Sequence, residues 1–333
     1  MRPFVLNGHE RPLTQVKFNR EGDLFITCGK NAQPCLWLTE TGKRIGTYVG
    51  HSGVVWSCDI SDESERLYTA SADGNLKVWS LPTGKELASI TVREPFRAVK
   101  LSVGGDMIAC STDSFMDSPA RLMIFRLTED GLPEGGDNAV PIISFEVPRK
   151  PGARSTLSRI YWTEENSCLI TSHDDGVVRK WNLDSGEIAL EVKIHEDSIQ
   201  DMQISTDATH LITASLDRTS KIIDAETLEV IKVYNAGRPV QSAALSPIFD
   251  HVVVAGGQDA SKVTTTVASN DEFESRFFHK VFGEEFGRVR GHFGPVNTVS
   301  FSPDGKSFVT GGEDGTVRLQ HFDNEYFTLV KAV

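Results

Sequence analysis

A histidine, an Asp-type turn residue and a strand residue recur along this chain at fixed distances. His51 precedes Asp73 by 22 residues and Trp79 by 28. The same two distances join His9 to Asn31 and Trp37, His195 to Asp217 and Ile223, and His292 to Asp314 and Gln320. Four coincidences of this kind do not arise by chance, so the chain consists of copies of one structural unit.

Three further units keep the turn residue without the histidine. They are marked by Asp113, by Asp175 with Trp181, and by Asp259. The seven turn positions then lie 42, 40, 62, 42, 42 and 55 residues apart. A period near 40, with Gly-His early and a Trp-containing strand late, is typical of four-stranded propeller blades. The sequence therefore predicts an all-β fold, a single seven-bladed β-propeller.

The second unit shows how a blade is encoded. Short runs rich in β-formers cover 54–60, 66–70, 76–79 and 86–90, and turn residues such as Asp73-Gly74 separate them. Asp-Gly between such runs is a strong tight-turn signal because glycine accepts a positive φ. The predicted blades are 8–50, 51–92, 93–150, 151–194, 195–236, 237–290 and 291–333.

Residues 2–7 precede the first histidine and have no blade of their own. They have the place of an outer strand, and we expect them to pair into the last blade and close the ring. In blade three, residues 129–138 contain three glycines and a proline, which predicts a surface loop. Blade six carries Phe273, Phe277, Phe278, Phe282 and Phe286. Either Phe277, Phe278 and Phe286 pack inside the blade, or Phe273 or Phe282 forms an exposed apolar patch for a partner.

Composition excludes several classes of function. Hydrophobic residues make up 39% and charged residues 24% of the 333 residues, and no apolar run has the length of a membrane span. The amino-terminal residues lack a secretory signal, so we expect an intracellular protein. Five cysteines without a Cys-x-x-Cys pair argue against a disulfide framework or a zinc site. A net charge of −12 disfavours direct RNA contact, including through Arg288 and Arg290.

His51, Ser71, Asp73 and Trp79 together suggest a catalytic Ser-His-Asp set. The position 20 residues after each histidine is Gly29, Ser71, Ser215 or Gly312, so a partial set reappears in several blades. An active site needs one preorganised set, which favours a buried structural network of histidine, turn Asp, Ser and Trp in each blade. The predicted network residues are His9, Trp37, His51, Ser71, Asp73, Trp79, Asp175, Trp181, His195, Ser215, Asp217, His292 and Asp314.

An enzyme built in the central channel would need titratable residues where the inner strands begin. Those positions are read as Thr14, Val54, Val99, Ile199, Val240 and Val296, which look like packing residues. The chain contains neither a phosphate-binding loop of the G-x-x-x-x-G-K-S/T type nor a His-Glu-x-x-His motif. We therefore expect no cofactor, no metal and no catalytic residues.

Several motifs resemble known proteins. Gly8-His9, Gly50-His51, Gly291-His292 and Asp73-Gly74 resemble those of WD-repeat propellers, and 238–247, 250–254, 263–266 and 285–295 are similar to the i subunit of eukaryotic translation initiation factor three. The resemblance implies a non-catalytic scaffold in the cytoplasm that binds the b and g subunits. It further implies support for recruiting mRNA and initiator tRNA to the small ribosomal subunit.

The resemblance also implies a partner site. In this family a carboxyl-terminal helix of the b subunit lies against a propeller face around blades five and six. Asp207 and Asp224 lie in turn-like segments of blade five and are expected to pair with basic residues of that helix. The alternative is a WD-repeat adaptor of another assembly, either a signalling scaffold or a substrate receptor of a ubiquitin ligase.

Overall fold

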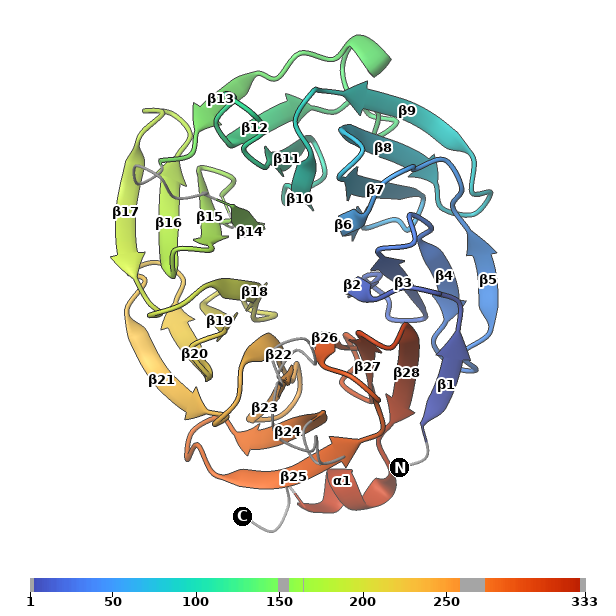
Figure 1. Ribbon diagram of the computed structural model, residues 1–333, viewed down its shortest axis with the longest axis vertical. Coiled ribbons are helices and arrows are strands. Elements are labelled where there is room, and N and C mark those ends of the chain that lie inside the picture. Colours follow the sequence, from blue (N-terminus) through green and yellow to red (C-terminus); the bar gives the residue numbers. More distant parts are fainter. Residues whose placement is uncertain (1–2, 149–155, 164, 258–272, 330–333) are drawn as a thin grey trace.

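Seven four-stranded antiparallel sheets stand around a central axis in the computed structural model (Figure 1). The structure describes residues 3–148, 156–163, 165–257 and 273–329. We number the sheets as blades one to seven from the innermost strand nearest the start of the chain. This arrangement confirms the predicted all-β, seven-bladed propeller.

Strands at the same place in each blade form four concentric sets. The innermost strands are β2 (Leu13–Phe18), β6 (Val55–Ile60), β10 (Phe96–Leu101), β14 (Leu157–Trp162), β18 (Ile199–Ile204), β22 (Val240–Leu245) and β26 (Val296–Phe301). The second strands are β3 (Leu24–Gly29), β7 (Arg66–Ser71), β11 (Met107–Thr112), β15 (Cys168–His173), β19 (His210–Ser215), β23 (His251–Gly256) and β27 (Ser307–Gly312). The third strands are β4 (Cys35–Leu38), β8 (Asn75–Ser80), β12 (Arg121–Arg126), β16 (Val177–Asn182), β20 (Thr219–Asp224), β24 (Glu274–His279) and β28 (Thr316–His321). The outer strands are β5 (Arg44–Thr47), β9 (Glu86–Thr91), β13 (Ile143–Glu146), β17 (Ile188–Lys193), β21 (Val230–Asn235), β25 (Glu285–Arg290) and β1 (Phe4–Asn7).

Blade two has the strands that its sequence predicts, each boundary lying within one residue of the expected position. Its Asp73-Gly74 turn joins β7 to β8. Gly74 has φ 78°, and a Cβ there would lie 2.5 Å from the carbonyl oxygen of Val92. Only glycine fits this position, because any side chain would meet both a left-handed backbone and a neighbouring main chain.

The hydrophobic core lies between neighbouring blades. Val78 of blade two packs with Phe96 and Ile108 of blade three, and Leu67 of blade two packs with Ile26 of blade one. All five side chains are buried. Burying one such side chain stabilises the fold by roughly 1.5–3 kcal/mol. Each blade is therefore held in place by its two neighbours, as in other repeat architectures.

Blade seven takes its outer strand from the opposite end of the chain. β1 pairs antiparallel with β28, with Phe4 opposite Leu319 and Asn7 opposite Thr316. Leu6 of β1 is buried in one cluster with Leu13 of blade one and other apolar residues of blades one and seven. The two ends of the described chain thus share one sheet (Figure 1).

Two segments carry features that the sequence did not indicate. The loop at 129–138 includes the 3-10 turn η1 (Gly136–Asn138) and is anchored to blade two. Tyr68 Oη donates to the Gly131 carbonyl at 2.7 Å, and Asp137 accepts from the Ser89 backbone N–H at 2.8 Å. The short helix α1 (Asn324–Leu329) follows β28, and its Tyr326 hydrogen-bonds to His251 of blade six at 2.7 Å.

The phenylalanines of blade six divide between core and surface. Phe277 and Phe278 are buried as expected, whereas Phe286 is 45% exposed, so its predicted burial is wrong. Phe286 belongs to the outer strand β25, and its ring lies 4.5 Å from that of His251. Phe282, in the turn before β25, is 61% exposed.

Candidate functional site

Four side chains of blade two form one continuous chain of hydrogen bonds. Trp79 Nε1 donates to Thr69 Oγ1 at 2.8 Å, and that oxygen lies 2.7 Å from His51 Nε2. His51 Nδ1 lies 2.9 Å from a carboxylate oxygen of Asp73. Because a carboxylate only accepts, we assign the ring proton to Nδ1, and Thr69 then donates to Nε2. The chain ties the third strand of the blade to the loop that enters it and to the Asp73 turn.

The same arrangement recurs in three other blades. The ring nitrogens of His9 lie 2.8 Å from Asn31 and 2.7 Å from Thr27, which also accepts from Trp37 at 2.8 Å. His195 lies 2.8 Å from both Asp217 and Thr213, and His292 lies 3.2 Å from Asp314 and 2.8 Å from Thr310. Blades five and seven have Ile223 and Gln320 at the Trp position and so lack the indole donor.

Sequence reasoning missed the threonine that links histidine to tryptophan. It stands 18 residues after each of the four histidines, a spacing as regular as those to the turn and to the Trp position. The serines expected to complete the network belong to the turn instead. Ser71 Oγ accepts from the Asp73 backbone N–H, and Ser215 Oγ from that of Asp217, both at 3.2 Å.

Blade four reaches a similar centre by another route. His173, in strand β15, places Nε2 2.8 Å from Thr171 Oγ1, which accepts from Trp181 at 2.8 Å. Asp175, predicted to join a histidine network, pairs with Arg179 at 2.9 Å. Asp259, the predicted turn residue of blade six, lies outside the described residues.

The electrostatics of these networks favour neutral imidazole beside an ionised carboxylate. Burial lowers the pKa of the His195 imidazole, and Asp217 opposes this only in part. Burial raises the pKa of the Asp73 carboxyl, but hydrogen bonds from His51 and from the Ser52 backbone N–H outweigh it and hold the pKa well below its usual range. The repeated, buried and mutually satisfied groups fit cross-links within blades better than one preorganised catalytic set.

The two aspartates expected at a partner site lie close together on blade five. Asp207 is in the turn between β18 and β19, and Asp224 ends β20 opposite His210 of β19. Each carboxylate also caps its own turn. Asp207 accepts from the Thr209 backbone N–H at 3.2 Å, and Asp224 accepts from the Thr227 backbone N–H at 2.8 Å.

Both carboxyl groups are ionised at neutral pH. The Ser205 hydroxyl, by its hydrogen bond, lowers the pKa of Asp207 to about 2. The Thr227 backbone N–H likewise lowers the pKa of Asp224. Asp207 is exposed and Asp224 partly exposed. The pair therefore presents two fixed negative charges to any partner at this surface.

These aspartates line a groove of about 530 Å³ between blades four and five. Its floor includes Trp162, Ile170 and Ile204, and its only lysine or arginine is Lys180. Its acidic residues are Glu165, Asp207, Asp224 and Glu226. We name it the blade-five groove. An acidic rim over an apolar floor suits a segment with basic and apolar side chains.

An apolar strip borders blade five on its outer edge. Strand β21 exposes Val230, Ile231 and Val233, which are 44%, 53% and 48% accessible. Lys232 Nζ of the same strand donates to the carbonyl oxygen of Phe282 in blade six at 3.3 Å. The strip therefore continues from blade five onto the exposed Phe282 ring, consistent with the exposed-patch alternative for that residue.

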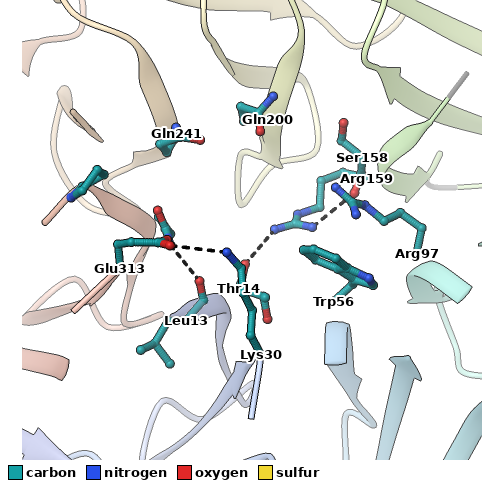
Figure 2. Close-up of a pocket in the computed structure, with 12 residues that line it drawn as sticks. Leu13, Thr14, Lys30, Trp56, Arg97, Ser158, Arg159, Gln200, Gln241 and Glu313 are labelled. Atoms are coloured by element: carbon teal, nitrogen blue, oxygen red, sulfur yellow. Dashed lines mark hydrogen bonds and ion pairs between the residues drawn. The ribbon is translucent and has the colours of Figure 1, made fainter. Parts of the chain in front are cut away.

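Every innermost strand begins with a β-bulge that turns one side chain into the central channel. The pairing register shifts between the first and third residues of each of these strands. A bulge leaves its extra residue unpaired and redirects its side chain. The residues so placed, one from each blade, are Thr14, Trp56, Arg97, Ser158, Gln200, Gln241 and Asn297 (Figure 2).

The channel mouth carries charge, so the expectation that packing residues occupy this end of the channel is wrong. Its charged lining residues are Lys30, Arg97, Arg159 and Glu313. Four of the positions expected there, Val99, Ile199, Val240 and Val296, are buried in the core. The bulge shifts the register by one residue. Its residue stands five places after the histidine in blades one, two, five and seven, which is a signal the sequence did contain.

Two kinds of site find no support in the part of the chain described. No three His, Cys, Asp or Glu side chains gather there in a way that holds a metal ion. Among the same residues, no helix has the length and apolar character needed to cross a bilayer.

Comparison with known proteins agrees along the whole chain. The protein-family model described as EIF3I matches residues 1–331. The chain is 44% identical over 330 residues to "Eukaryotic translation initiation factor 3 subunit I" of Drosophila grimshawi, covering 98% of each chain. It is 43% identical over 327 residues to the Homo sapiens protein of that name, again covering 98% of each. The chain belongs to the EIF3I family, that of subunit I of eukaryotic translation initiation factor 3.

Proposed function

We propose that this chain is a non-catalytic scaffold subunit of translation initiation factor 3, acting in the cytoplasm. In this role it binds the b and g subunits and supports recruitment of mRNA and initiator tRNA to the small ribosomal subunit. Family membership supports the assignment to this factor. The closed ring supports the scaffold role, because rigid blades present large surfaces with little loss of conformational entropy on binding.

The blade-five groove is the observation that carries the proposal. It combines two fixed carboxylates, Asp207 and Asp224, with an apolar floor and a volume of about 530 Å³. A helix with apolar residues on one face and Lys or Arg beside them fits this chemistry. The b subunit supplies such a segment in our proposal, and the apolar strip at Ile231 and Phe282 extends the contact toward blade six.

Blade seven offers a matched control for the aspartates. Asp304 caps its turn as Asp207 does, accepting from Ser302 Oγ at 2.6 Å and from the Lys306 backbone N–H at 3.0 Å. Replacing Asp304 by lysine thus removes the same kind of turn cap at another blade. Any difference between the two sites reports on the partner and not on the turn.

The test is co-purification of the b and g subunits with tagged variants. The double variant Asp207→Lys with Asp224→Lys should weaken b-subunit binding by at least about tenfold, because facing like charges across an interface cost several kcal/mol. Asp304→Lys should retain the b subunit. Equal retention by both variants, with unchanged affinity, would remove the groove from the proposal.

Sedimentation of the tagged parent chain from a cell extract tests the assembly itself. Co-migration with other initiation-factor subunits, partly at the density of the small ribosomal subunit, supports the proposed function. Recovery with a signalling receptor or a ubiquitin ligase, without initiation-factor subunits, would favour the alternative adaptor.

A further inference from the structure

The mouth of the central channel is a cavity of about 300 Å³ with two unlike sides. Arg97 and Arg159 approach from one side, next to Trp56, and Glu313 stands opposite (Figure 2). Glu313 is neutralised in place, since Lys30 lies 3.4 Å from one of its oxygens and Asn297 donates to the other at 2.7 Å. The cationic side is therefore the one with charge left to offer.

Arg97 is held by stacking and not by hydrogen bonds. Its guanidinium carbon lies 3.9 Å from the centre of the Trp56 indole ring. Its nearest carboxylate, Asp113, is 3.8 Å away, beyond hydrogen-bond distance, and within the described residues the guanidinium makes no hydrogen bond. A mostly buried guanidinium with unused N–H donors at a cavity wall is poised for an acceptor.

Arg159 is a fixed second charge beside it. Its Nε donates to Asp201 at 2.7 Å, and its Nη1 donates to the Ser158 carbonyl at 3.2 Å. Burial lowers the pKa of Arg97, Asp113 raises it, and the neighbouring charge of Arg159 lowers it again. Two guanidinium groups brought together in this way repel each other, and a bound anion relieves that repulsion.

The remaining wall distinguishes a peptide from a polyphosphate. Gln200 and Gln241, from blades five and six, bring side-chain amides to the mouth. Amide groups both donate and accept, which matches a peptide main chain, whereas a nucleic-acid backbone offers chiefly acceptors. The fixed Glu313 and the net charge of −12 oppose a run of phosphates but tolerate one carboxylate on the far side of the cavity.

We propose that the channel mouth binds an acidic peptide segment of a partner protein, with an Asp or Glu carboxylate placed between Arg97 and Arg159. The carboxylate accepts two parallel hydrogen bonds from Arg97, whose plane is set by Trp56. Gln200 and Gln241 bond the peptide main chain. This site lies on the channel and is separate from the blade-five groove, so it does not depend on the b-subunit assignment.

Trp56 provides a direct readout. Of the five tryptophans, four are buried and Trp56 is partly exposed, so a ligand at Arg97 acts chiefly on its fluorescence. The probe is a short oligoglutamate peptide blocked at both ends, so that only side-chain carboxylates are available. Blocked oligolysine and single-stranded oligouridylate serve as comparison ligands. Oligoglutamate should change the Trp56 signal saturably, and oligolysine should not.

Arg97→Gln should weaken oligoglutamate binding roughly tenfold to a hundredfold, the loss expected for a charge-assisted bidentate contact. The fold should survive, because Arg97 makes no hydrogen bond within the described residues. Arg97→Glu should in addition create binding of oligolysine. Arg11→Gln, an exposed arginine in the loop that enters blade one, controls for general surface charge and should bind as the parent does.

Three results would overturn the proposal. They are equal binding of oligoglutamate by the parent and by Arg97→Gln, no saturable response of the parent, and tighter binding of oligouridylate that Arg97→Gln abolishes. The last would assign the mouth to RNA. Thermal melting of each variant verifies that the comparison is made on folded protein.

Discussion

Blades two and four bury nearly the same Thr–Trp–imidazole centre, yet they build it from different parts of the chain. In blade two the imidazole comes from His51 in the entering loop and reaches Asp73 as well as Thr69. In blade four it comes from His173 within strand β15 and bonds only Thr171, since its Nδ1 has no partner among the described residues.

The difference separates two roles that blade two combines. One role is to satisfy the buried threonine and tryptophan, and either imidazole does this. The other is to tie the entering loop to the turn, which requires a histidine in the loop and an acceptor in the turn. In blade four the turn residue Asp175 pairs with Arg179 instead, so the first role persists without the second.

His51→Ala should give the largest loss of stability in this comparison, about 3–4 kcal/mol. It removes two hydrogen bonds, leaves Thr69 and Asp73 underpaired, and opens space beside Trp79, where an unpaired buried group alone costs roughly 1–3 kcal/mol. Urea unfolding of the purified chain measures the change. A variant that unfolds at the parental midpoint would refute the structural role of the network.

His173→Ala should cost less, about 2–3 kcal/mol, because only one hydrogen bond is lost although the ring is equally buried. The same urea titration places the two variants side by side. If the His173 variant proved the weaker of the two, the tie between loop and turn would contribute nothing measurable in blade two.

Acidification should destabilise blade four through His173. Burial, with a further contribution from Arg179, lowers the pKa of His173 to about 3 from an ordinary value of 6.5. The folded state therefore binds fewer protons than the unfolded state between these values, and stability falls as pH decreases below about 6.5. The loss approaches slightly more than 1 kcal/mol per pH unit. His173→Gln should flatten this part of the profile between pH 6.5 and 5, and parallel profiles for parent and variant would contradict the assignment.

Trp79→Phe and Trp181→Phe should have the smallest effects, about 1 kcal/mol each beyond the change in volume. Both indoles donate to threonine at 2.8 Å, so the two blades should respond alike. Thermal melting of the two variants is the measurement. A clear inequality would mean that the loop histidine of blade two strengthens the Trp bond, as cooperative hydrogen bonding permits.

Much of this architecture is legible in the sequence, for reasons tied to particular residues. His51 and Asp73 can be paired because their spacing spans one complete pair of strands and repeats in four units. Thr69 was overlooked because threonine is common in strands, and only the fold shows which face it occupies. His173 replaces a missing loop histidine from another position, which no fixed spacing reveals.

The surfaces were harder to predict than the networks. Arg97 faces the channel because a β-bulge displaces the side-chain alternation by one residue, and bulges leave little trace in a single sequence. The blade-five groove needs residues of two blades, so Asp207 alone did not indicate the apolar floor beside it. Packing within a repeat follows from periodicity, whereas surfaces between repeats depend on three-dimensional placement.

The pairing of β1 with β28 has a consequence for the order of events in synthesis. Phe4 emerges from the ribosome among the first residues, but its partner Leu319 emerges only when nearly the whole chain has been made. Joining ends so far apart costs about 3–4 kcal/mol more conformational entropy than closing a hairpin. Blades one to six can assemble in sequence while the first strand waits unpaired. Ring closure is thus the last step of folding, and a chain terminated before β28 keeps two open edges by which the cell can tell it from a finished one.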